Sequence, residues 1–112
     1  MMPQSTGEPT DMIETAIMNI QRAKTRTQAA LRLVGDLRMN GDARRNATVA
    51  KTHLKALDDT RRALRRISAL QANVTTPVAV ATWKSKARAY RDLAENLVQS
   101  TDDVIAALLA HR

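Results

Sequence analysis

The stretch DARRNATVAKTHLKALDDTRRALRRISALQAN, residues 42–73, is the part of the chain around which the rest is predicted to fold. Its apolar residues recur at intervals of three and four, which is the period of an α-helix with one buried side. These residues are Ala43, Ala47, Ala50, Leu54, Leu57, Leu64 and Ile67. Asp42 precedes them and can accept hydrogen bonds from the free N–H groups of a helix start. The stretch therefore predicts a long helix over residues 42–72.

The opposite side of this predicted helix is strongly basic. Five cations follow one another at steps of seven, four, seven and four residues: Arg44, Lys51, Lys55, Arg62 and Arg66. Because eleven residues make almost three turns, these side chains form one line of about 33 Å at ~1.5 Å per residue. Eight basic residues against three acidic ones give the stretch a charge of +5, which is most of the chain's +7. We call this line the basic track.

The chain before this stretch predicts a tail and a first helix. Residues 1–10 contain two prolines and a glycine among small polar residues, a composition typical of a disordered tail. A helix over about 11–39 is predicted, because Asp11 and Glu14 resemble a capping box and Asn40-Gly41 is a helix stop.

A third helix is predicted over about 77–110. Thr76 can cap its start, and Pro77 suits the first helical position, where its missing N–H costs no hydrogen bond. Short loops between three helices of similar length predict an all-α, antiparallel three-helix bundle as a single domain over residues 11–112. The alternative is a long helical hairpin, in which the first two helices straighten or swap across Gly41 into a dimer.

The flanking helices each have one apolar face for this bundle. The face of the first predicted helix holds Ile13, Ala16, Ile17, Ile20, Ala23, Thr27, Ala30, Leu31, Val34 and Leu37. The face of the third holds Trp83, Ala87, Tyr90, Leu93, Ala94, Leu97, Val98, Thr101, Val104, Ile105 and Leu108. Polar residues lie at or beside the three apolar stripes, namely Lys24, Thr27, Thr60, Arg61 and Thr101. They could form a layer that sets the register, or they could be edge positions whose long side chains reach outward to solvent.

The up-down-up order predicts where charges meet. Residue numbers at one level should sum to about 82 for the first two helices and about 150 for the second and third. Arg44 and Arg45 then lie near Asp102 and Asp103, which neutralise them. The cations further along the second helix lie near the basic start of the third. The predicted binding surface is therefore Arg62, Arg65, Arg66, Lys84 and Arg88, extended by Arg44, Lys51 and Lys55. The alternative is a solvated basic face without a ligand.

Three apolar residues are candidates for an interface. Met18 and Leu33 fall on the far side of the first predicted helix. Trp83 is expected in the core, with an interface hot spot as the alternative.

The sequence lacks the residue patterns of an enzyme or a metal site. There is no cysteine, and neither of the two histidines has a second ligand one helical turn away. His53 is expected to be a hydrogen-bonded packing residue. We therefore predict no catalytic residue, no metal, no cofactor and no small-molecule substrate.

The expected function is that of a small basic binding protein. It would engage a nucleic-acid backbone without sequence specificity, or an acidic protein, through the basic face of its middle helix. The alternative is a self-assembling structural or adaptor protein, and a homo-oligomer fits either function. No stretch suits a membrane span or a signal peptide, so no membrane partner and a cytoplasmic location are expected.

Overall fold

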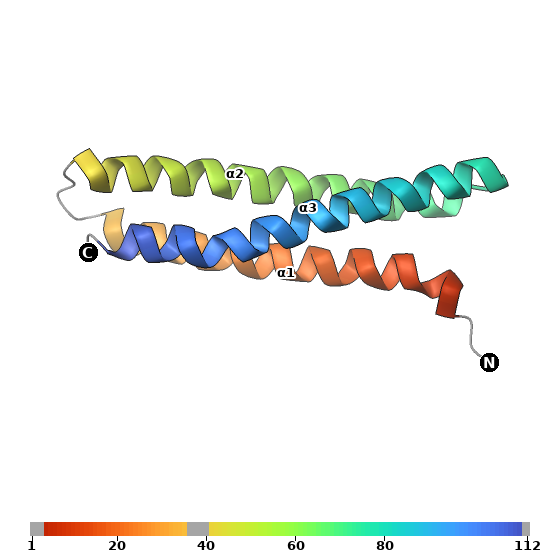
Figure 1. Cartoon of the computed structure of the whole chain (residues 1–112), viewed down its shortest axis with the longest axis horizontal. Coiled ribbons are helices and arrows are strands. Elements are labelled where there is room, and N and C mark those ends of the chain that lie inside the picture. Colours follow the sequence, from red (N-terminus) through yellow and green to blue (C-terminus); the bar gives the residue numbers. More distant parts are fainter. Residues whose placement is uncertain (1–3, 36–40, 111–112) are drawn as a thin grey trace.

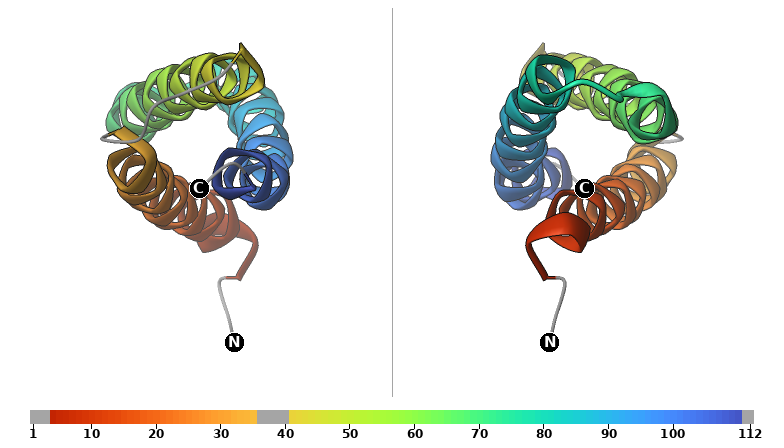
Figure 2. Two further views of the ribbon diagram at one scale, coloured as in Figure 1. Left: turned by 90° about the vertical axis from the view of Figure 1, so that its left-hand side faces the viewer. Right: turned by 90° about the vertical axis from the view of Figure 1, so that its right-hand side faces the viewer.

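The computed structural model describes residues 4–35 and 41–110, with side chains for 12–34 and 41–110. Its helices are α1 (Gln4–Gly35), α2 (Gly41–Leu70) and α3 (Pro77–Leu109), with a short 3₁₀-helix, η1 (Gln71–Asn73), after α2. The three long helices run side by side in up-down-up order (Figure 1), and each packs against the other two (Figure 2). The predicted all-α three-helix bundle is confirmed, and the described residues contain no strand. The straightened hairpin is wrong, because α1 and α2 pack together within one chain.

The start of the first helix differs from the prediction. It begins at Gln4, so the helical start assigned to Asp11 is wrong, and residues 4–10 are helical although a disordered tail was predicted there. Gly7 and Pro9 weaken a helix without forbidding it, and the ribbon bends in its first turns (Figure 1). At the other end α1 is described as far as Gly35, and the predicted end of this helix near residue 39 lies outside the described residues.

The middle helix begins one residue earlier than predicted. Gly41 is its first residue and has no positive φ, so it opens α2 instead of closing α1. Asp42 lies within the first turn, where a carboxylate is stabilised by the helix dipole. The α-helix ends at Leu70, and η1 occupies the last predicted turn. Asn40 lies outside the described residues.

The start of α3 follows the prediction closely. The Thr76 side chain accepts a hydrogen bond from the Ala79 N–H at 3.1 Å, and Pro77 takes the first helical position. The indole Nε1 of Trp83 donates a hydrogen bond of 2.6 Å to the carbonyl oxygen of Ile67. This bond joins the first turns of α3 to the last turns of α2 and fixes how the two helices lie.

The core consists of two apolar clusters. The larger contains Ile13, Ala16, Ile20, Ala23, Leu57, Leu64, Ile67, Trp83, Ala87 and Ala94. The smaller contains Ala30, Val34, Ala47, Ala50 and Leu108. On each long helix, one buried polar residue separates the members of the two clusters: Thr27 on α1, His53 on α2 and Thr101 on α3. Of the five residues predicted for a polar layer, Thr27 and Thr101 are in this layer, and His53 is a member that was not predicted. The other three lie elsewhere: Thr60 is buried between residues of the larger cluster, and Lys24 and Arg61 pair with Asp58.

Two residues predicted for the core are exposed instead. Tyr90 and Leu93 of α3 are 36% and 44% exposed. They lie on the α2 side of α3, at the margin of the interface, because the buried line of α3 runs through Trp83, Ala87 and Ala94. Leu37 lies outside the described residues.

Candidate basic binding surface

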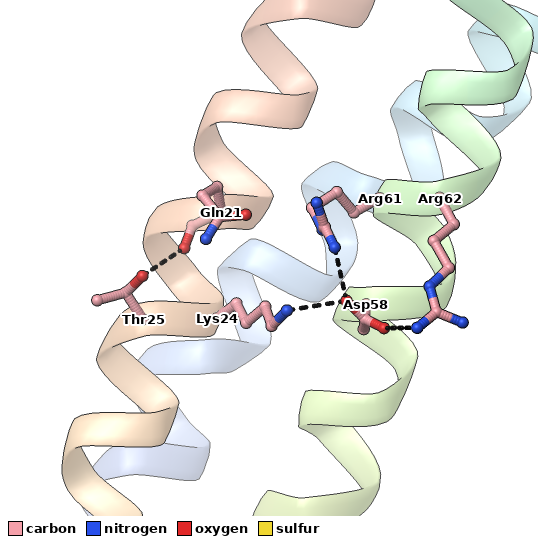
Figure 3. A network of polar contacts seen from close by, with 6 residues as sticks. All are labelled: Gln21, Lys24, Thr25, Asp58, Arg61 and Arg62. Atoms are coloured by element: carbon pink, nitrogen blue, oxygen red, sulfur yellow. Dashed lines mark hydrogen bonds and ion pairs between the residues drawn. The ribbon is translucent and has the colours of Figure 1, made fainter.

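One carboxylate of α2 holds three cations. Asp58 Oδ1 accepts from Lys24 Nζ of α1 at 2.9 Å and from Arg61 at 3.0 Å, and Asp58 Oδ2 pairs with Arg62 at 2.9 Å (Figure 3). Lys24 and Asp58 stand at the level predicted for α1 and α2, since their numbers sum to 82. The hydrogen bond from Lys24, with that from Arg61, lowers the pKa of Asp58 from 3.8 to about 2. Asp58 is therefore ionised at neutral pH and joins α1 to α2.

The side chains of the basic track are exposed along α2, but they are not equivalent. Arg62 is bonded to Asp58, whereas Arg44, Lys51, Lys55 and Arg66 form no ion pair among the described residues. The predicted neutralisation of Arg44 and Arg45 by α3 is wrong. Asp102 pairs instead with Arg26 of α1 at 2.6 Å, and Arg45 pairs with Asp42 at 3.7 Å.

Charge is divided unevenly along the bundle. The basic end comprises residues 12–22 of α1, 60–70 of α2 and 77–90 of α3, and the other half is the mixed end. The described cations of the basic end are Arg22, Arg61, Arg62, Arg65, Arg66, Lys84, Lys86 and Arg88, against the carboxylate of Glu14. The mixed end has eight cations against seven carboxylates. If Glu8 and Asp11 are added from the sequence, the basic end still has five more cations than carboxylates.

The predicted site residues share this end but not one face. Lys84, Arg88 and Glu95 are spaced by four and seven residues, so they lie on one side of α3. Glu95 lines a hollow between α1 and α3, which identifies this as the side of α3 that faces α1. Arg62 and Arg66 are exposed on α2, away from its buried line. The cations of the basic end therefore surround the bundle, and no single patch unites all of them.

The predicted binding surface left out three cations of this end, namely Arg22, Arg61 and Lys86. Lys86 is exposed and lies between Lys84 and Arg88 in sequence, but two residues rotate it by about 200°, to the α2 side of α3. A charge count by level would have found it, whereas the search for one line of cations passed over it.

The three predicted interface residues differ in how exposed they are. Trp83 is 6% exposed and packed in the larger cluster, so its interpretation as a surface hot spot is wrong. Met18 and Leu33 are 54% and 55% exposed on α1, as expected for residues outside the core. Exposure alone does not assign them a partner.

The described residues give little support for a metal site, a small-molecule pocket or a membrane-spanning helix. Its His, Asp and Glu side chains form no group of three that could hold a metal ion. The hollow between α1 and α3 has a volume of about 180 Å³, below the roughly 300 Å³ at which pockets begin to suit a small ligand. Among the described residues, no helix has the length and hydropathy needed to cross a membrane.

Comparisons of the chain with protein-family models, with characterised proteins and with solved structures give no match. Its function is therefore inferred from its own residues.

Proposed function

We propose that this chain is a non-enzymatic binding protein whose basic end contacts the phosphate backbone of a nucleic acid. The observation that carries the proposal is the charge asymmetry: eight described cations lie at one end of the bundle, against the carboxylate of Glu14 at that end and that of Asp58 just beyond it. Most of these cations are exposed, and Arg61 and Arg62 are the pair that Asp58 engages. A cytoplasmic location, where nucleic acid is accessible, belongs to the same proposal.

The chemistry of this end favours the backbone over the bases. Arginine and lysine bind phosphates through charge and hydrogen bonds that carry no sequence information. Stacking on bases needs exposed aromatic rings, and the Trp83 ring is buried in the core. We therefore expect binding with weak sequence preference.

The dependence of nucleic-acid affinity on salt concentration can be estimated from the number of phosphates contacted. One approach to the outer face of α2 can bring three or four cations of the basic end onto phosphates, because the others face different sides. Release of counterions from duplex DNA, at about −0.9 per contact, then predicts a slope of about −2.7 to −3.6 for log K against log salt concentration. Affinity would fall roughly 40- to 150-fold between 50 and 200 mM salt.

The test is fluorescence anisotropy of a labelled duplex of mixed sequence, titrated with the protein at several salt concentrations. The informative variant is Arg65→Glu/Arg66→Glu, which avoids Arg62 because a glutamate there would repel Asp58 four residues away. The matched control is Arg44→Glu/Lys51→Glu, which changes the net charge equally on exposed residues at the mixed end of the same helix.

The proposal predicts a salt slope lower by about 2 and a loss of affinity of at least about tenfold in the Arg65→Glu/Arg66→Glu variant, with a much smaller loss in the control. Equal losses in both variants would show that the basic track or the net charge acts, and not the basic end. Absence of binding at 50 mM salt would overturn the proposal and make an acidic protein the partner to seek.

A further inference from the structure

Asp58 is surrounded by more positive charge than one carboxylate can balance. Lys24, Arg61 and Arg62 pair with it at 2.9, 3.0 and 2.9 Å, which sets three positive charges against one negative charge (Figure 3). Within the described part of the chain, these three cations pair with no other carboxylate. The excess positive charge of the cluster is therefore available to an anion from outside the chain.

The three cations differ in how firmly the fold holds them. The side chains of Lys24 and Arg61 are each 20% exposed, whereas that of Arg62 is 69% exposed. The Nε atom of Arg61 is buried, so an anion arriving from solvent does not reach it. An exposed ion pair contributes little to stability, because water and salt screen it. Arg62 is therefore the member of the cluster that leaves Asp58 most easily.

Asp58 is also an incomplete partner for Arg62. A guanidinium binds an anion most strongly when two of its N–H groups reach two oxygens of the same anion. The contact of Arg62 runs from Nη2 to Oδ2 at 2.9 Å, while Oδ1 is already taken by Lys24 and Arg61. A phosphate group offers free oxygens to both N–H groups of the fork. Phosphate is therefore the better partner for Arg62.

Arg62 belongs to a group of three neighbouring arginines on α2. At about 100° per residue, Arg62, Arg65 and Arg66 lie within roughly 100° of the helix circumference. All three are exposed. Arg65 and Arg66 form no ion pair among the described residues, so Arg62 is the member of the group with an internal competitor for phosphate.

We infer that Asp58 competes with phosphate for Arg62, and that a nucleic-acid phosphate displaces it while Lys24 and Arg61 stay bound to it. This inference rests on the proposed function and names the residue that limits it. Asp58 then has two effects: it joins α1 to α2, and it weakens phosphate binding on the outer side of α2. A purely structural Asp58 predicts the opposite sign, because its removal would only disturb the cations around it.

The affinity of the Asp58→Asn variant for the labelled duplex tests the sign. Asp59→Asn is the matched control, because Asp59 is the next residue, is exposed and forms no ion pair among the described residues. Both variants remove one negative charge. Asp58→Asn should bind about two- to fivefold more tightly than the control, which is the range expected for release of an exposed ion pair. Equal affinities, or weaker binding by an Asp58→Asn variant that circular dichroism shows to be folded, would overturn the inference.

Arg62→Gln locates the effect. In the wild-type background this change should lower the affinity only slightly, because Asp58 already holds the guanidinium. In the Asp58→Asn background it should lower the affinity by about two- to fivefold more. The same loss in both backgrounds would show that Asp58 acts through its charge alone and not through Arg62, and the inference would then be wrong.

Inorganic tripolyphosphate tests the exchange without nucleic acid and with Asp58 in place. In the wild-type protein, the NMR signal of the Arg62 Nε–H, assigned by its loss in Arg62→Gln, should shift together with those of Arg65 and Arg66. The Arg61 signal should move much less. A titration that shifts Arg65 and Arg66 but not Arg62 would overturn the inference. If the duplex does not bind at all, the proposed function fails, and this titration still decides whether phosphate displaces Asp58 from Arg62.

Discussion

Replacing Thr101 by valine should destabilise the bundle through His53, the only imidazole among the described residues. Thr101 Oγ1 donates its proton to the Leu97 carbonyl at 2.9 Å, and the same oxygen lies 2.7 Å from His53 Nε2. A hydroxyl has one proton, so Nε2 must be the donor in this bond. Valine would leave that buried N–H without an acceptor.

The expected magnitude follows from burial. Thr101 is fully buried and His53 nearly so. A buried donor that loses its partner costs about 1–3 kcal/mol, whereas removing both partners can be nearly neutral. We therefore expect Thr101→Val to cost about 2 kcal/mol, and His53→Leu/Thr101→Val to cost clearly less than the two single changes added together.

The assay is urea unfolding followed by circular dichroism at pH 7.5 for the wild type, both single variants and the double variant. A coupling energy of about 1 kcal/mol or more between the two positions supports the hydrogen bond. Costs that add within about 0.5 kcal/mol would refute the reasoning, because the two side chains would then act independently.

The pH dependence of the free energy of unfolding tests the burial of His53 by a second route. Burial lowers the pKa of His53 below 6.5. The unfolded chain therefore binds a proton at a higher pH than the folded chain, and the free energy of unfolding should decrease as the pH falls below about 6.5. His53→Leu should lose this slope, and His111→Gln should keep it. A wild-type stability that does not change between pH 7 and 5 would contradict the burial of a neutral imidazole.

Two further predictions concern the contacts that join the helices. Trp83→Phe should cost about 1–3 kcal/mol, because the indole bond to Ile67 is lost in a buried site; urea unfolding measures this, and an unchanged midpoint would contradict it. Asp58 has its pKa lowered to about 2, so its contribution to stability is present above pH 3.8 and is lost as the pH falls through about 2. Asp58→Asn should therefore be less stable than the wild type at pH 5, and the difference should shrink toward pH 2; a constant difference would show that ionisation of Asp58 is not involved.

The amphipathic pattern was a good guide to the helices and to most of the core. Leu57, Leu64 and Ile67 were predicted from their spacing and are buried. The levels of the helices were also predictable, because short loops leave little freedom in where neighbouring helices meet: Ile67 and Trp83 form a hydrogen bond at the sum of 150 expected for α2 and α3. The helix ends were predicted less well, since Gly41 reads equally as a stop of one helix or the start of the next.

The candidate surface could be predicted only in part. The cations of α2 are evident from the sequence, and their location at one end follows from the up-down-up order. Their distribution around that end could not be predicted, because it depends on how far each helix is rotated about its own axis. The same rotation decides that Tyr90 and Leu93 are exposed, and that Asp58 reaches Lys24 of α1.

The sequence by itself determined the all-α class, the three long helices and the excess of positive charge, because periodicity, caps and residue counts are properties of a single segment. The tertiary structure decided which charges pair, where His53 is buried and which large apolar residues remain exposed. These depend on distances between helices, and a residue's own helix fixes its angle and height but not what stands opposite it. Arg62 and Arg66 illustrate the difference: they are one turn apart on the same exposed side of α2, and of the two, Arg62 is the one that Asp58 holds.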